Sequence, residues 1–192
     1  KIVKEENPRT IVIVGGPHPS AFPEEVLGEE EIDACVVGEG ERPFLNFVRT
    51  VASKSDLSSA EELDQIKALS HTLRGRMHLS KERDYIDDLD SIPFPSRDLL
   101  PNEKYAGPPT KRITSGRGGN MITSRGCYYN CTYCESEVIW SRKVRQRSAK
   151  NIVDEMEELH KKYGVTEINF HDDILPMRRE HALEMCNEIL HR

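Results

Sequence analysis

The sequence lacks long apolar runs, an excess of positive charge and a regular set of cysteines. None of its 192 residues lies in an apolar run approaching the ~20 residues that cross a bilayer. The charged residues 1–9 lack the apolar core of a signal peptide. Lys and Arg total 27 against 33 Asp and Glu, so the net charge is −6, which argues against a general binder of nucleic acid. These absences favour a cytoplasmic protein with no membrane span and no nucleic-acid partner.

The cysteines are few and unevenly placed. The five are Cys35, Cys127, Cys131, Cys134 and Cys186. An odd count with one tight cluster is not a disulfide framework, and it indicates an intracellular metal site. The two isolated cysteines, Cys35 and Cys186, lie in apolar stripes and are expected in the core.

The first part of the chain alternates strand and helix patterns. We expect a strand at 10–14, a helix near 23–27, a strand at 34–37, a helix at about 41–51 and a hairpin within 68–79. This β-α-β-α order predicts a parallel, Rossmann-like sheet. One face of the fourth element is apolar and is expected to face the core; it carries Phe44, Phe47, Val48 and Val51.

The alternation resumes after a proline-rich stretch. We expect a strand at 120–123, a helix from the N-cap Ser148 to Gly164, a strand at 167–171 and a helix from about Arg178. The pairs Glu157–Lys161 and Glu158–Lys162 support the first of these helices. The inward residues of the last helix are expected to be Ala182, Leu183, Cys186, Ile189 and Leu190.

The cysteine cluster carries the clearest chemistry. Cys127, Cys131 and Cys134, spaced by three and then two residues, can converge on one metal centre from a single loop. A [4Fe–4S] cube favours thiolate ligands, and three cysteines leave its fourth iron open. A structural zinc site needs four closed ligands, and the loop has no fourth Cys or His. Zinc is therefore the weaker metal hypothesis, and three inert buried cysteines are the remaining alternative.

This motif, with Tyr133 directly before the third cysteine, resembles that of the radical S-adenosylmethionine (SAM) superfamily. The resemblance implies a [4Fe–4S] cluster whose open iron chelates SAM, and whose electron cleaves SAM to methionine and a 5′-deoxyadenosyl radical. It implies an electron donor such as flavodoxin or ferredoxin. It also places Tyr133 against the adenine, with packing inside the protein as the alternative role.

Four further segments extend the resemblance over nearly the whole chain. They are Gly15-Gly-Pro-His-Pro-Ser20, Val36-Val-Gly-Glu-Gly-Glu41, Leu89-Asp-Ser-Ile-Pro-Phe-Pro-Ser-Arg-Asp98 and Arg145-Gln-Arg-Ser148. Together they resemble the cobalamin-binding subfamily, which joins a B12-binding domain to a partial (β/α)6 barrel. Its members include methyltransferases and anaerobic Mg-protoporphyrin IX monomethyl ester oxidative cyclases. The implied function is SAM cleavage for cobalamin-linked methyl transfer or oxidative cyclisation of a small molecule, with a tetrapyrrole or a lipid as candidates.

The resemblance also suggests roles for residues outside the cysteine loop. Gly15 and Gly16 match the double glycine beside the cobalamin tail, although a glycine after a buried strand is also ordinary turn chemistry. Asp172, or its neighbour His171, is expected as a polar SAM contact at the end of the second barrel strand.

Two motifs of the family are absent from the sequence, and two arginines have alternative interpretations. The chain has neither the Asp-x-His-x-x-Gly segment that supplies a cobalt ligand in many B12 proteins nor the Gly-Gly-Glu segment of many radical SAM relatives. Arg145 and Arg147 are candidates for the SAM carboxylate, with solvated charges as the default interpretation. No catalytic residue is predicted.

The predicted fold class is α/β. Residues 1–80 would form the C-terminal half of a Rossmann-like B12-binding domain, 81–118 a proline-rich linker, and 119–192 the first part of a partial TIM-type barrel. We expect a piece of a longer enzyme that is inactive alone and could dimerise through exposed strand edges. The alternative from another functional class is a non-catalytic iron–sulfur or zinc-binding module.

Overall fold

The structure is a computed structural model that describes residues 1–52, 60–72, 75–104, 116–175 and 178–192. The chain forms two compact units. Unit 1 comprises residues 1–86 and 128–142, and unit 2 comprises residues 87–127 and 143–192. Within the described ranges, no helix is both long enough and apolar enough to cross a bilayer.

Unit 1 contains a sheet of three strands in the order β1-β2-β3. They are β1 (Ile13–Val14), β2 (Ala34–Val36) and β3 (Leu69–His71). The pairing of β1 with β2 is parallel, as predicted, and β3 runs antiparallel to β2. The predicted hairpin is present as an antiparallel bridge between His71 and His78, with residues 73–74 outside the described part.

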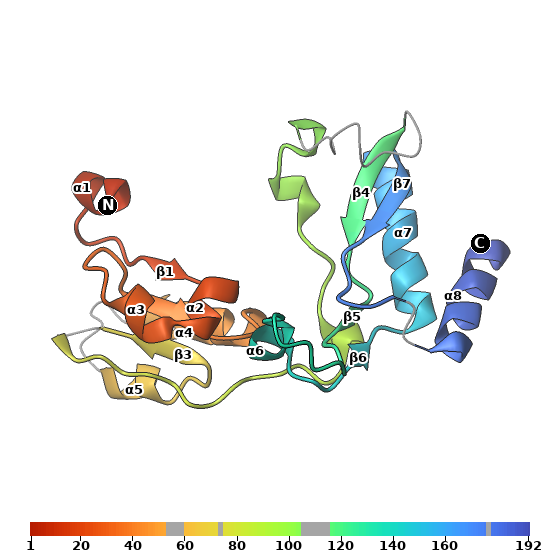
Figure 1. Cartoon of the computed structure of the whole chain (residues 1–192). Helices are drawn as coiled ribbons and strands as arrows, with labels where there is room; N and C mark the ends of the chain where they lie inside the picture. Colours follow the sequence, from red (N-terminus) through yellow and green to blue (C-terminus); the bar gives the residue numbers. More distant parts are fainter. Residues whose placement is uncertain (53–59, 73–74, 105–115, 176–177) are drawn as a thin grey trace. The chain divides into compact units, whose positions relative to one another are not determined.

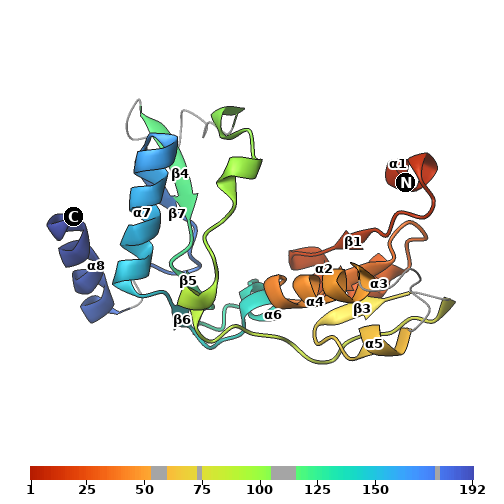
Figure 2. The ribbon, with the colours of Figure 1, turned by 180° about the vertical axis from the view of Figure 1, so that it is seen from behind.

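Helices cover both faces of this sheet (Figure 2). The helices of unit 1 are α1 (Ile2–Glu6), α2 (Pro17–Ala21), α3 (Pro23–Leu27), α4 (Glu41–Ala52), α5 (Ala60–Asp64) and α6 (Ser136–Trp140). Ala34 and Val36 of β2 pack in one cluster with Phe47 of α4. Cys35 packs on the other face with Val26 of α3. The alternation of side chains along β2 therefore produces a layered α/β core.

The predicted inward face of α4 is wrong in part. Phe47 is buried, but Phe44 and Val48 are close to half exposed. Pro43 and Phe47 lie one helical turn apart and contact the core, whereas Phe44 and Val48 lie on the neighbouring stripe. The apolar surface of α4 is therefore wider than the area that the described sheet covers.

Unit 2 is built on a parallel strand pair joined by a helix (Figure 1). Strands β4 (Arg117–Met121) and β7 (Val165–Phe170) pair in parallel, and α7 (Ala149–Tyr163) packs against them. A Cβ at Gly119 would lie 2.9 Å from Val165 Cγ1, so only glycine allows this approach of the strands. The remaining elements are the antiparallel pair β5 (Ser124–Arg125) and β6 (Arg145–Gln146), helix α8 (Arg179–His191), and 3-10 turns at Leu89–Ser91, Arg97–Leu99 and Asn102–Lys104.

The predicted inward face of α8 is wrong. Met185 is the residue that packs into the unit 2 core with α7. Leu183, Cys186 and Ile189 are exposed, and Leu190 is 82% exposed. Docking on α7 thus selects the side of the helix that bears Met185 and turns the wider apolar stripe outward.

The predicted caps of α7 are confirmed. The Ser148 hydroxyl accepts a hydrogen bond from the Asn151 N–H at 3.1 Å, and Gly164 ends the helix with φ +65°. The predicted ion pairs between Glu157 and Lys161 and between Glu158 and Lys162 are also present.

Ser148→Ala is expected to lower the free energy of unfolding by about 1 kcal/mol, because the Asn151 N–H loses its acceptor at the helix start. Urea denaturation followed by circular dichroism measures the change. Ser148→Thr retains a hydroxyl acceptor and is expected to stay close to the wild type. An Ala variant with an unchanged urea midpoint would contradict the capping role.

Candidate cofactor site

The loops after the two parallel strands of unit 1 lie together. Gly16 follows β1 with φ +108°, and Gly38 follows β2 with φ +92°. The buried Ser20 hydroxyl donates to the Gly16 carbonyl at 2.7 Å and accepts from the Gly38 N–H at 2.9 Å. Ligands of open α/β sheets bind at the carboxyl ends of the strands, so these loops occupy the edge where a cofactor is expected. The sequence pattern did not indicate this role for Ser20.

The two predicted glycines differ in their surroundings. A Cβ at Gly16 would have no heavy atom within 4 Å, whereas one at Gly15 would lie 3.9 Å from Val36 Cβ. The positive φ of Gly16 accounts for a glycine there on conformational grounds alone. The open space beside Gly16 is also what the approach of a cofactor tail requires, so the residues fit both interpretations.

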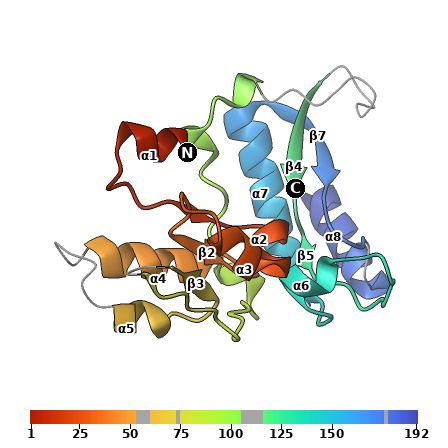
Figure 3. The ribbon, with the colours of Figure 1, turned by 60° about the vertical axis from the view of Figure 1, so that its left-hand side comes forward.

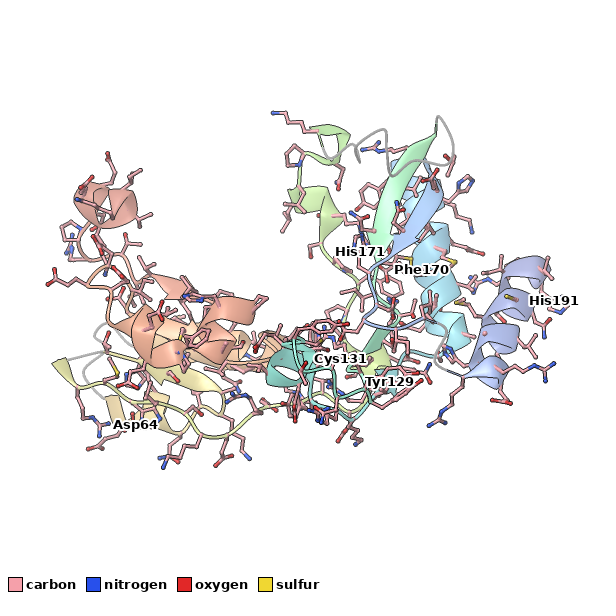
Figure 4. All side chains as sticks on the ribbon, viewed as in Figure 1. Asp64, Tyr129, Cys131, Phe170, His171 and His191 are labelled. Atoms are coloured by element: carbon pink, nitrogen blue, oxygen red, sulfur yellow. The ribbon has the colours of Figure 1, made fainter. Side chains whose placement is uncertain are left out.

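The cysteine loop presents accessible thiols. Cys131 and Cys134 are exposed in unit 1, and the Cys134 N–H donates to the Cys131 carbonyl at 3.2 Å. Cys127 is half-buried and is the last residue of unit 2 before the loop. The Tyr133 ring is 88% exposed, so it does not pack within this unit. Figure 4 labels Cys131 in this loop.

The two isolated cysteines differ from the loop thiols and from each other. Cys35 is fully buried, as predicted, and burial raises the pKa of its thiol to about 11. Cys35 is therefore a neutral core residue. Cys186 is exposed on α8, so its predicted core position is wrong.

The helix after the cysteine loop packs beside the glycine loops. Helix α6 begins two residues after Cys134 and contacts α2, which begins directly after Gly16 (Figure 3). A Cβ at Gly38 would lie 3.4 Å from the Ile139 carbonyl oxygen, so α6 comes within van der Waals range of the Gly38 loop. Helix α6 was not predicted, although the apolar run 138–140 is a sequence signal for it.

The Asp172 carboxylate joins the ends of the strands in unit 2. Its Oδ1 accepts from the Thr123 N–H at 3.0 Å, the Thr123 hydroxyl at 2.8 Å and the Ser124 hydroxyl at 2.6 Å, while Oδ2 shares the Thr123 N–H at 3.1 Å. The neighbouring His171 side chain is exposed, with Nε2 3.1 Å from Asn120 Oδ1. The structure thus gives Asp172 a role within the chain that the sequence did not indicate.

A buried charge cluster lies between α7 and the segment before β4. Glu155 is 2% exposed and pairs with the guanidinium groups of Arg97 and Arg147. Arg147 also donates to the Ile122 carbonyl at 2.9 Å, and Arg145 is buried. The default interpretation of Arg145 and Arg147 as solvated charges is therefore wrong.

A second charge cluster lies in unit 1 and was not predicted. Asp64 Oδ1 is 3.0 Å from His71 Nε2 and 3.3 Å from His78 Nδ1, and Arg76 pairs with the other carboxylate oxygen. His71 is fully buried. Burial lowers the pKa of His71, and the Asp64 carboxylate opposes this shift without reversing it.

Acidification is expected to destabilise unit 1 through His71. Because the folded pKa lies below the ordinary value of about 6.5, the unfolded chain takes up a proton that the folded chain resists. The stability due to neutral His71 is complete above that value and is lost as the pH falls. Urea midpoints measured between pH 7.5 and 5.5 test this, with His71→Gln as the control. An equal pH dependence in the wild type and His71→Gln would contradict it.

The donors of the cysteine loop fit an iron–sulfur cluster. Across the part of the chain that the structure describes, no three His, Cys, Asp or Glu side chains are already grouped as a metal site. Metal sites commonly assemble as the metal binds, so free, accessible thiols on one loop suffice. Cys127, Cys131 and Cys134 are such thiols, and thiolates are the donors that iron–sulfur clusters take.

Two family models match the chain. The B12 binding domain matches residues 1–48, and the radical SAM superfamily matches residues 121–190. The first match contains the Gly15-Gly16 loop, and the second contains the cysteine loop.

Curated relatives match almost the whole chain. An uncharacterized methyltransferase of Pyrococcus horikoshii is 36% identical, over 98% of this chain and 39% of the relative. Cytidylyl-2-hydroxyethylphosphonate methyltransferase of Streptomyces wedmorensis is 28% identical, over 96% of this chain and 38% of the relative. Anaerobic magnesium-protoporphyrin IX monomethyl ester cyclase of Rubrivivax gelatinosus is 31% identical, over 100% of this chain and 33% of the relative. The chain thus spans between 33% and 39% of the length of these relatives.

Solved structures share the fold. The cobalamin-dependent SAM radical enzyme OxsB with aqua-cobalamin bound matches with a TM-score of 0.73 at 20% identity, over 100% of this chain and 26% of that chain. The radical SAM methyltransferase TsrM of Kitasatospora setae, with tryptophan and a SAM analogue bound, matches with a TM-score of 0.64 at 22% identity. The match covers 95% of this chain and 33% of that chain. The predicted fold class, a B12-binding domain followed by part of a TIM-type barrel, is confirmed.

Proposed function

This chain belongs to the radical SAM proteins that carry a B12-binding domain, and from that premise we propose that it is part of an enzyme that cleaves SAM reductively and uses cobalamin for methyl transfer or oxidative cyclisation. The observation that carries the proposal is the packing of α6 on α2. It holds the helix after Cys134 beside the loops that contain Gly16 and Gly38. A cluster loop and a cobalamin loop would then be supported by the same small core.

Each predicted site residue has a role in this proposal. Cys127, Cys131 and Cys134 would hold three irons of a [4Fe–4S] cluster, and the exposed Tyr133 ring would cover the adenine of SAM. When bound, the cluster supplies the single electron that cleaves SAM. The protein binds and orients the cofactors and excludes water from them.

The other roles belong to the strand ends. Gly15 and Gly16 would border the cobalamin tail, because the space beside Gly16 is open. Asp172 would contact SAM through Oδ2, the oxygen with fewer hydrogen bonds from the chain, while Oδ1 fixes the end of β7. This arrangement makes Asp172 both a structural and a binding residue.

The proposal extends to organisation and partners. Residues 1–80 would be the B12-binding part, 81–118 the linker and 119–192 the first part of the barrel. The longer enzyme would act in the cytoplasm on a small molecule, with a tetrapyrrole or a lipid as candidates, and would take electrons from a flavodoxin or ferredoxin. The isolated chain would be inactive on substrate, because barrel active sites draw on loops after several strands, and it would dimerise through unpaired strand edges.

Anaerobic reconstitution tests the proposed function. The chain is expected to bind about four irons with matching sulfide and to show the visible absorbance of an iron–sulfur cluster. Addition of SAM and a strong reductant is then expected to release 5′-deoxyadenosine, while modification of substrate is measured with the longer protein. Zinc binding without iron–sulfur uptake would favour the metal-binding module, and a loaded cluster that never cleaves SAM would favour an electron carrier.

A further inference from the structure

Arg142 ties together both sides of the Cys131–Cys134 segment. Its Nη1 donates to the Tyr129 carbonyl at 2.9 Å, and its Nη2 donates to Asn130 Oδ1 at 2.5 Å. Nη2 also pairs with the Glu137 carboxylate. Tyr129 and Asn130 precede Cys131, whereas Glu137 lies on α6 after Cys134. One guanidinium therefore closes a ring of chain that contains both cysteines.

The backbone before Arg142 adopts a conformation that few residues other than glycine adopt. Ser141, the C-cap of α6, has φ +67° and ψ 173°. This region is essentially limited to glycine, and residues are held there when the surrounding structure requires it. The turn at Ser141 ends α6 and directs the following residue back toward the loop. The unfavourable turn at Ser141 thereby allows Arg142 to contact Tyr129, Asn130 and Glu137.

The ring that Arg142 closes is fixed to the core of unit 1. Glu137 lies in the first turn of α6, and α6 packs on α2. The guanidinium thus connects Tyr129 and Asn130 to a helix whose position is set by tertiary packing. Charged, forked hydrogen bonds of this kind are among the stronger and more directional contacts in proteins.

We infer that Arg142 is a positioning residue that holds Cys131 and Cys134 ready to bind the cluster, an inference that rests on the proposed function. The described thiols are not grouped as a metal site in advance. Ordering the loop before binding reduces the conformational entropy that cluster binding must overcome. Arg142 touches the loop and not the reacting atoms, so it acts through the two cysteines.

The first test uses the chain without a cluster. Amide hydrogen exchange in residues 128–138 is expected to become about 10-fold faster in Arg142→Gln, because the loop loses its charge-assisted hydrogen bonds. Lys143→Gln is the matched control, since it removes the neighbouring cation, which pairs with Asp87 at 2.6 Å in unit 2. Glycine suits the backbone conformation at position 141 better than serine does. In Ser141→Gly, the amides of residues 128–138 are therefore expected to exchange no faster than in the wild type.

The second test uses the reconstituted chain. Iron release to a chelator is expected to be about 10-fold faster in Arg142→Gln, the lower end of the loss seen when groups supporting metal ligands are removed. The electron paramagnetic resonance spectrum of the reduced cluster is expected to broaden. Arg142→Lys keeps the cation but not the fork and is expected to restore part of the retention. Lys143→Gln is expected to match the wild type.

The outcomes separate this inference from the proposed function. A wild-type chain that takes up no iron and sulfide would overturn the proposed function. The inference alone would be overturned if the wild type takes up the cluster normally but shows the same loop amide exchange and the same rate of iron release as Arg142→Gln. If Arg142→Gln loses its circular dichroism spectrum, Asn130→Ala provides the test, because it removes one acceptor and leaves the guanidinium. Unchanged loop exchange in that variant would also overturn the inference.

Discussion

Replacing Cys127, Cys131 or Cys134 by Ala is expected to abolish the visible absorbance of the reconstituted chain and to remove most of its iron. Each substitution leaves two thiolates in the loop, and a [4Fe–4S] cube with an open fourth iron needs three. The effect should be nearly complete for each residue, because the three ligands act on one cluster. Iron and sulfide analysis together with the absorbance spectrum measures the loss.

Two cysteines of the same chain serve as controls. Cys186 is exposed like Cys131 and Cys134 but lies on α8, so Cys186→Ala tests whether any accessible thiol contributes. Cys35 is fully buried with a raised pKa, so Cys35→Ala tests a neutral core thiol. Both variants are expected to keep the spectrum. An equal loss in either would show that the loop does not hold the cluster alone.

Glu155→Ala is expected to destabilise unit 2 by about 3–5 kcal/mol. The substitution removes the carboxylate that Arg97 and Arg147 share. Because both arginine side chains are only 11% exposed, water cannot readily replace it. Removing one partner of a buried ion pair costs much more than the pair contributes, because the remaining charges stay desolvated. Native-state hydrogen exchange of the α7 amides measures the change in this unit.

The matched control lies on the same helix. Glu158 pairs with Lys162 at 3.2 Å near the surface, so Glu158→Ala is expected to change the stability by less than about 0.5 kcal/mol. Glu155→Gln keeps the shape and two polar atoms and is expected to cost less than Glu155→Ala. A Glu155→Ala variant as stable as Glu158→Ala would contradict the importance of the buried cluster.

Local patterns predicted the regular elements well. The start and end of α7 followed from Ser148 and Gly164, because capping depends on neighbours within one turn. The apolar runs of β1 and β2 predicted a parallel pair, because strands buried on both faces need continuous apolar sequence. The spacing of the three cysteines likewise marked the loop without any knowledge of the fold.

The contacts that hold the site were beyond such patterns. Asp172 and Thr123 are separated by 49 positions, and Arg97 and Glu155 by 58, so no local period relates them. Helix α6 has five residues, too few to be stable alone, and depends on its packing against α2. The outward stripe of α8 shows the same limit, because amphipathic pattern identifies an apolar face but not the neighbour that covers it.

Unit 1 consists of two separate segments of the chain, and this affects the order in which it folds during synthesis. Residues 1–86 emerge from the ribosome first, and residues 128–142 follow only after the whole segment 87–127 of unit 2. Helix α2 ends at Ala21 and α6 ends at Trp140, so at about 5–20 residues per second α2 is synthesised about 6–24 s before α6 is complete. Closing so long a loop also slows the docking step itself. The last segment to join unit 1 is therefore the one that brings Cys131 and Cys134 to it.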